Sequence, residues 1–264
     1  MMIPVRLAAV LLTLAMLGAC GSTPQLPEPP PRVTIAPQAP ASPQDRARLH
    51  TNLASGYYER GQMDVAIEEL NIAVSLDPNY APAYNLYGLV YAVLGENGKS
   101  EQNFERAMQL SPRDPDFHHN WGWYLCQHRR EREALAQFDI AVQDPLYRTP
   151  EIALVNAGRC AITLGEVRNA EAYFRRALSA QPGNALANYG LALVAYKEAR
   201  YEEARGWMRG VMQVNSPPPD ALYLGLCIER KLGDRQAELS YISQLRNRYP
   251  DSVETKAITT EVCE

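Results

Sequence analysis

The sequence has little that would let it cross a membrane or bind a nucleic acid. Its long apolar run, Leu7–Leu17, has eleven residues and is interrupted by Thr13, whereas a helix needs about 20 apolar residues to span a bilayer. The formal net charge is −4, and it becomes −5 when Arg6 is removed with the N-terminal segment. The basic pairs at 129–130 and 175–176 have acidic neighbours, so no basic surface for nucleic acid is expected.

The sequence also lacks the short motifs of common enzyme sites. It has no G-x-S-x-G, no glycine loop of the phosphate-binding type and no H-E-x-x-H. These patterns place a nucleophile, a phosphate group or a zinc ion. We therefore expect no enzymatic activity, no cofactor and no small-molecule substrate.

The first twenty residues have the build of a secretory signal peptide. A short segment ending at Arg6 is followed by the apolar run and by Gly18 and Ala19, directly before Cys20. The order L-G-A-C resembles the lipobox of bacterial lipoproteins. That resemblance implies that residues 1–19 are removed and that Cys20 carries a diacylglycerol and a third acyl chain, which together anchor stably. The alternative is an ordinary signal peptide in which Cys20 has no such role.

The segment 20–44 is expected to tether a folded domain to a membrane. Eight prolines lie between Pro24 and Pro43, and such a composition favours polyproline II rather than a packed core. Gly21 and Ser22 follow Cys20, without the aspartate that, by resemblance to bacterial lipoproteins, would imply retention at the inner membrane. The resemblance therefore implies the periplasmic face of the outer membrane. The alternative is that the proline stretch is itself a ligand for another domain.

The rest of the chain repeats with a period of 34 residues. The dipeptides that end in Pro78, Pro112 and Pro182 are 34 and 70 positions apart, and 70 is two periods plus two residues. Small residues recur at the eighth position of each unit and large ones at the twenty-fourth, as with Gly88 and Phe104. This pattern resembles the tetratricopeptide repeat, a pair of helices ended by a proline.

The resemblance implies an all-α fold, a right-handed superhelix of six helix-turn-helix repeats with a groove lined mainly by the first helices. The repeats are predicted within residues 45–251, and a capping segment is predicted at 252–264. Repeat three is two residues longer than the period because of the insertion around Pro145. The predicted repeats are 47–80, 81–114, 115–150, 151–184, 185–217 and 218–251.

The stretch 117–128 holds three of the four histidines and two of the three tryptophans, yet it is not expected to be a metal or catalytic site. Metal ligands on one helix lie three or four residues apart, and neither His118 nor His119 has a ligand at that spacing. Cys126 lies near a helix C-terminus, which does not lower a thiol pKa. The alternative is a site shared with another repeat. Trp121, at the seventh repeat position, is expected in the core.

The groove positions of tetratricopeptide repeats are the fifth, ninth and thirteenth of each unit. The residues at these positions are aromatic and apolar with a few polar anchors, as a groove for a peptide or helix would be. The alternative for Trp123 is packing against a neighbouring repeat. The predicted groove residues are Tyr58, Asn85, Leu89, His119, Trp123, Gln127, Arg159, Tyr189, Leu193 and Tyr196.

Four cysteines remain if Cys20 is lipidated, and four cysteines allow three pairings. Cys126 and Cys160 are 34 residues apart, which is one period, and Cys227 and Cys263 are 36 apart. In a compartment that permits disulfides, proximity favours Cys126–Cys160 and Cys227–Cys263. The alternative is that these cysteines are buried free thiols.

Several segments together resemble one family. They are the lipobox, the proline-rich spacer, N-W-G-W-Y-L-C from Asn120, the insertion P-L-Y-R-T-P, and N-A-G-R-C ending at Cys160. This combination is similar to the type IV pilus biogenesis tetratricopeptide lipoproteins of the PilF/PilW type, known as pilotins. The resemblance implies a lipoprotein that binds subunits of the type IV pilus secretin and promotes their outer-membrane localisation and multimerisation.

Two other functions are compatible with the sequence. One is a different periplasmic tetratricopeptide lipoprotein, an adaptor for β-barrel assembly or for cell-wall machinery. The other is a thiol-active periplasmic protein that uses Cys126 or Cys160. If the secretin stays monomeric or mislocalised when the gene is removed, the protein is a pilotin rather than the first alternative. Thiol titration of the folded protein tests the second alternative.

Overall fold

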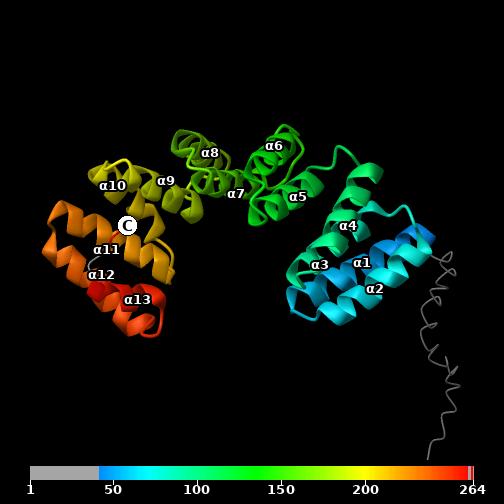
Figure 1. Cartoon of the computed structure of the whole chain (residues 1–264), viewed down its shortest axis with the longest axis horizontal. Helices are drawn as coiled ribbons and strands as arrows, with labels where there is room; N and C mark the ends of the chain where they lie inside the picture. Colours follow the sequence, from blue (N-terminus) through cyan, green and yellow to red (C-terminus); the bar gives the residue numbers. More distant parts are fainter. Residues whose placement is uncertain (1–41, 261–262, 264) are drawn as a thin grey trace, which may run out of the picture. The chain divides into compact units, whose positions relative to one another are not determined.

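The computed structural model describes residues 42–260 and Cys263, and these residues form helices and turns without a strand (Figure 1). The predicted signal peptide, Cys20 and most of the proline-rich tether lie outside the described residues. The elements are α1 (Pro43–Glu59), α2 (Met63–Leu76), α3 (Ala81–Val93), α4 (Asn97–Leu110), α5 (Pro115–Gln127), α6 (Glu131–Ala141), α7 (Pro150–Thr163), α8 (Val167–Ala180), α9 (Ala185–Lys197), α10 (Tyr201–Val211), α11 (Pro219–Leu232), α12 (Arg235–Arg248), α13 (Val253–Ala257) and the 3-10 helix η1 (Ile258–Thr260).

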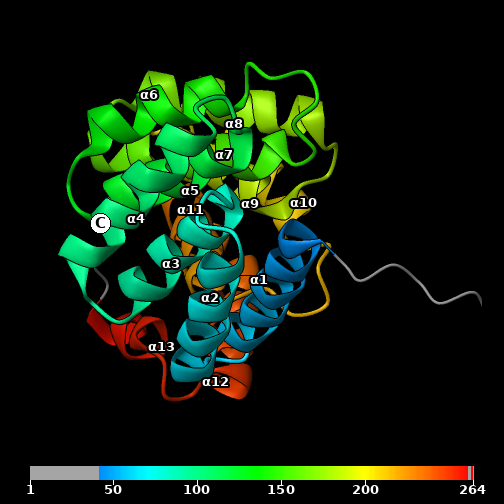
Figure 2. The same ribbon diagram turned by 90° about the vertical axis from the view of Figure 1, so that its right-hand side faces the viewer.

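The helices α1 to α12 pack as six consecutive pairs. Each odd-numbered helix packs mainly on the even-numbered helix that follows it, and α1 and α2 lie side by side in both views (Figure 1 and Figure 2). Each pair then packs on the next, so the buried apolar side chains form a series of neighbouring clusters. The fold is therefore the predicted superhelix of tetratricopeptide repeats, in which each unit covers the apolar face of its neighbour.

The turn inside each pair places one residue in the left-handed conformation that ends a helix. Four of these six residues are glycines, with φ of 73° at both Gly61 and Gly95, 80° at Gly165 and 78° at Gly233. The other two are Arg129, with φ of 60°, and Ala199, with φ of 57°. The two exceptions adopt a conformation that disfavours residues with a Cβ atom.

A glycine on the first helix and a phenylalanine on the second let each of the middle pairs pack closely. A Cβ atom on Gly88 would lie 2.7 Å from the ring of Phe104, and one on Gly158 would lie 2.6 Å from Phe174. Both rings are almost completely buried. The predicted small and large positions therefore have a direct packing role.

The first helix begins earlier than predicted. The Ser42 hydroxyl accepts a 3.0 Å hydrogen bond from the Asp45 N–H, and α1 starts at Pro43. A serine N-cap accepts a hydrogen bond from an N–H of the first helical turn that has no partner within the helix. Proline suits the first helical position because an N–H at that position would make no hydrogen bond within the helix. The assignment of residues 43 and 44 to the tether is thus wrong.

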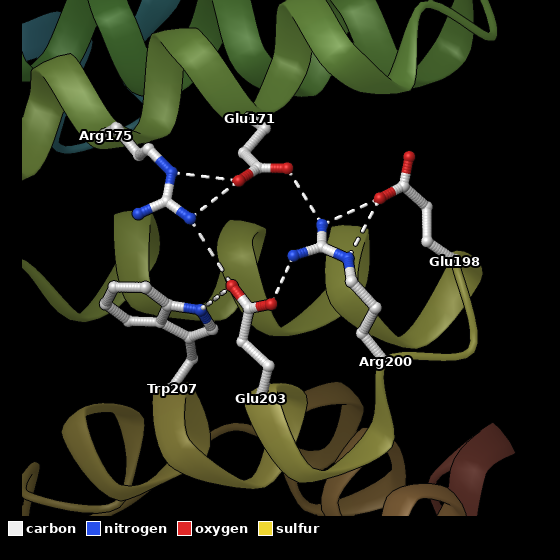
Figure 3. A network of polar contacts seen from close by, with 6 residues as sticks. All are labelled: Glu171, Arg175, Glu198, Arg200, Glu203 and Trp207. Carbon is white, nitrogen blue, oxygen red and sulfur yellow. Dashed lines mark hydrogen bonds and ion pairs between the residues drawn. The ribbon is translucent and has the colours of Figure 1, made fainter.

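A network of ion pairs connects the fourth and fifth repeats (Figure 3). On α8, the Glu171 carboxylate accepts from Arg175 at 2.7 Å and from Arg200 at 2.8 Å. Glu203 of α10 pairs with both arginines and accepts from the Trp207 indole N–H at 3.2 Å. A single ion pair that is as exposed as these stabilises a protein little. Here each carboxylate contacts both arginines, so the network links α8 to α10.

Candidate functional site

Three of the predicted groove residues meet in one hollow between α5 and α7. Trp123 and Gln127 lie one turn apart on α5 and face the same side as Arg159 of α7. We call this the central hollow, with a volume of about 450 Å³. Its lining residues are Trp123, Cys126, Gln127, Arg129, Glu131, Phe138, Asn156, Arg159, Cys160 and Thr163.

A disulfide bond joins the two walls of the central hollow. Cys126 of α5 is bonded to Cys160 of α7, with 5.9 Å between their Cα atoms. The bond spans the junction that contains the two-residue insertion, and it holds Trp123 and Arg159 on neighbouring helices. This pairing is the one that the repeat period favoured.

The central hollow carries an excess of positive charge. Arg129 and Arg159 line it and are both exposed, and Glu131 supplies the acidic side chain of the lining. Neither guanidinium has an ion-pair partner among residues 42–260 and Cys263. Unpaired arginines beside an accessible tryptophan are the groups that dominate many protein interfaces.

A second hollow, the apolar hollow, lies between α7 and α9 and has a volume of about 310 Å³. Tyr189 and Leu193, both predicted groove residues, line it together with Leu186. It shares Arg159 and Thr163 with the central hollow. Burial, with a contribution from Asp220, raises the pKa of Tyr189 to about 12, so this hydroxyl stays neutral. The full lining is Arg159, Ile162, Thr163, Phe174, Leu186, Tyr189, Gly190, Leu193 and Asp220.

His119 does not belong to the open groove, contrary to the prediction. Its Nε2 lies 3.0 Å from the Asn156 side-chain nitrogen and its Nδ1 lies 2.9 Å from the Tyr147 hydroxyl. The amide N–H donates to Nε2, and the Nδ1–H therefore donates to Tyr147. Burial lowers the pKa of His119 to about 4, so the ring is neutral at physiological pH. Tyr147 comes from the insertion and is buried, so His119 holds the insertion in place.

Tyr196 is also buried rather than exposed in the groove. Its hydroxyl donates a 2.9 Å hydrogen bond to the backbone carbonyl of Cys263, and Cys263 is disulfide-bonded to Cys227 of α11. The C-terminal segment thus covers this position, with α13 packed against α11 and α12. The assignment of Tyr196 to the binding surface is wrong.

The remaining predicted groove residues lie on the first two repeats and line neither hollow. Tyr58 of α1 and Leu89 of α3 are half-buried and pack against the apolar cluster of those repeats. Asn85 accepts a 3.3 Å hydrogen bond from Asn120 of α5. These three side chains are therefore partly packed and partly exposed, away from the two hollows.

The histidine and tryptophan cluster of α5 is dispersed by the helix. His118 contacts Gln137 and the Pro112 carbonyl, whereas His128 contacts Asn97 and the Tyr124 carbonyl. No group of three His, Cys, Asp or Glu residues that could hold a metal is found in the described part of the chain. Likewise, no helix within 42–260 has the length and apolarity to span a membrane.

Trp121 was expected in the core of its own helix pair, and the structure places it at the edge of that core. Its ring is half-buried, 5.4 Å from the Phe104 ring of α4 and 5.3 Å from the Tyr124 ring. The Arg130 guanidinium lies over the Trp121 ring, 5.6 Å from its centroid. Trp121 also packs against the apolar cluster of its own pair, which contains Leu125 and Phe138, so it lies at the junction of the second and third repeats.

Sequence reasoning missed several residues of the two hollows. Arg129 lies in the turn between the two helices of its pair, where four of the six repeats have a glycine. An arginine at a position that usually holds glycine was the sequence signal that could have identified it. Asn156, Leu186 and Asp220 lie at positions outside the expected fifth, ninth and thirteenth of each repeat. Side chains from neighbouring turns of the helix therefore widen the surface beyond the consensus positions.

Comparison with protein-family models finds tetratricopeptide repeats along the described chain. Models of the tetratricopeptide repeat match residues 119–184 and 155–213, residues 81–114 and residues 221–252, and a TPR repeat model matches residues 55–95. Together with the paired helices and the hollows along the first helices, these matches define the class. The chain is a tetratricopeptide repeat protein.

Known relatives narrow this class. The type IV pilus assembly protein PilF of Pseudomonas aeruginosa is 27% identical over 218 residues, which are 82% of this chain and 86% of PilF. The crystal structure of PilW, a widely conserved type IV pilus biogenesis factor, has 31% identity and a TM-score of 0.74, and covers 81% of this chain and 98% of PilW. The structure of Pseudomonas aeruginosa PilF has 25% identity and a TM-score of 0.76, and covers 83% and 99%. This chain belongs to the family of type IV pilus biogenesis tetratricopeptide repeat proteins.

Proposed function

We propose that the chain is a pilotin, an outer-membrane lipoprotein that binds subunits of the type IV pilus secretin and promotes their localisation and multimerisation. The observation that carries this proposal is the likeness to PilF and PilW, which extends over 82% and 81% of the chain. Tetratricopeptide repeats form extended binding surfaces, and the likeness to pilus biogenesis proteins supports a binding role in that process.

The proposed mechanism assigns a task to each part of the chain. The acyl chains on Cys20 hold the protein on the periplasmic face of the outer membrane, since two or three chains anchor stably where one does not. The proline-rich segment gives reach, at about 3.1 Å per residue in polyproline II. The hollows along α5, α7 and α9 then hold a segment that is exposed on the unassembled secretin.

Removing the gene tests this proposal in a strain that makes type IV pili. We expect the secretin to remain monomeric or to accumulate outside the outer membrane, and the wild-type gene to restore multimers. The Cys20→Ser variant should fold normally, by circular dichroism, yet appear in the soluble periplasmic fraction and fail to restore multimers. A normal secretin ring in the outer membrane of the deletion strain would contradict the proposal.

A further inference from the structure

We infer that the central hollow and the apolar hollow together bind one extended peptide segment of the partner. In this arrangement, a carboxylate of the segment lies between Arg129 and Arg159, and an apolar side chain of the same segment packs on Leu186, Tyr189 and Leu193. The inference rests on the proposed function and adds the chemistry of the bound segment. It also selects repeats three to five as the site.

The charge of the central hollow selects a carboxylate as its ligand. Two exposed arginines line it against one glutamate, in a chain whose formal net charge is −4. A guanidinium binds carboxylates through paired, charge-assisted hydrogen bonds. The Asn156 and Gln127 amides in the same lining can add further hydrogen bonds to the backbone of the segment.

The apolar hollow selects an apolar side chain at a short distance from that carboxylate. Leu186 is 58% exposed at its rim, although it is a large hydrophobic residue. The two hollows share Arg159 and Thr163, so they are separated by about one helix spacing, roughly 9 Å. An extended chain covers that distance in about three residues. The carboxylate and the apolar side chain of the bound segment should therefore be about three residues apart in its sequence.

Two predicted groove positions that flank the two hollows are engaged in contacts within the chain. On α5, His119 is bonded to Tyr147 and Asn156. On α9, Tyr196 is covered by the C-terminal segment through its bond to the Cys263 carbonyl. The central hollow and the apolar hollow use other residues of α5, α7 and α9, and neither His119 nor Tyr196 lines them.

The turn residues offer a matched pair of variants for a test. Arg129 and Ala199 both have a positive φ, at equivalent positions of repeats three and five, but only Arg129 lines the central hollow. Replacing either by glycine relieves the same backbone strain. Arg129→Gly therefore removes the guanidinium without threatening the fold, and Ala199→Gly controls for the relief of strain.

The experiment uses 15-residue fluorescent peptides that tile the periplasmic part of the type IV pilus secretin from the same organism. Their binding to the full chain in detergent is measured by fluorescence anisotropy, beside that of the intact secretin monomer. We expect the binding peptides to carry Asp or Glu about three residues from a large apolar side chain. Arg129→Gly, Arg159→Gln and an Asp→Asn change in the peptide should each weaken binding about tenfold or more, whereas Ala199→Gly should leave it unchanged.

Two results would overturn the inference while leaving the proposed function in place. One is peptide binding that Arg129→Gly and Arg159→Gln do not weaken. The other is binding of the intact secretin without binding of any peptide, which would mean that a folded surface is recognised. If the intact secretin itself does not bind, the proposed function fails, and the inference fails with it.

Discussion

Replacing Gly158 by alanine tests the packing that joins the helices of the fourth repeat. A Cβ atom at this position would lie 2.6 Å, 2.7 Å and 2.8 Å from three ring atoms of Phe174. The ring cannot move away, because it is fully buried and its atoms also lie 2.4 Å from where a Cβ atom of Gly190 would be. The added methyl group therefore has to displace α7 from α8.

Two opposing effects set the size of the change. Overfilling a packed core costs about 1–3 kcal/mol, while alanine in a helix interior is favoured over glycine by about 1 kcal/mol. We expect Gly158→Ala to lower the free energy of unfolding by up to about 2 kcal/mol, because the two terms leave a net cost of about 0–2 kcal/mol. For a domain of this size that corresponds to a fall in Tm of up to about 8 °C.

The matched control is Gly206→Ala on α10. A Cβ atom there would meet only the end of the flexible Arg209 side chain, at 3.8 Å, so the variant should gain about 0.5–1 kcal/mol from helix propensity. Thermal and urea unfolding, followed by circular dichroism with the disulfides intact, measure both variants. Equal stabilisation by the two substitutions would refute the packing argument.

The disulfide between α5 and α7 and the neutral histidine beside it give two further predictions. The Cys126→Ser, Cys160→Ser double variant should lose about 3–4 kcal/mol of stability, because the bond closes a 34-residue loop in the unfolded chain; an unchanged urea midpoint would contradict this. His119 has a folded pKa of about 4, below its unfolded value of about 6.5. The unfolded chain therefore binds more protons between these values, and stability should fall by about 2–3 kcal/mol as the pH is lowered from 6.5 to 4. His119→Gln should remove that part of the pH dependence. If the free energy of unfolding of the variant fell with pH as steeply as that of the wild type, the pKa of His119 would not be lowered in the folded protein.

The helix pairs could be predicted from the sequence because their signals are local and repeat. The spacing of Gly88 to Phe104 recurs as Gly122 to Phe138, so one packing rule accounts for both pairs. The period of 34 residues also brought Cys126 and Cys160 to neighbouring first helices. The family resemblance followed from segments that the same register explains.

The parts of the site that were predicted wrongly depend on contacts between distant residues. His119 occupies a groove position, but Tyr147 of the insertion, 28 residues later, covers it. Tyr196 is covered by a carbonyl 67 residues away. A repeat register describes the average unit, and it cannot show which insertion or terminal segment closes over a given position.

The most direct test of the pilotin assignment is to recover the chain from cells that are assembling pili and to quantify what binds to it. Mild crosslinking, detergent extraction and affinity purification of the full chain, followed by quantitative mass spectrometry, give that measurement. We predict that the type IV pilus secretin is recovered in near-stoichiometric amount, and that this amount falls in the Arg159→Gln variant. Recovery of β-barrel assembly or cell-wall proteins without the secretin would contradict the assignment.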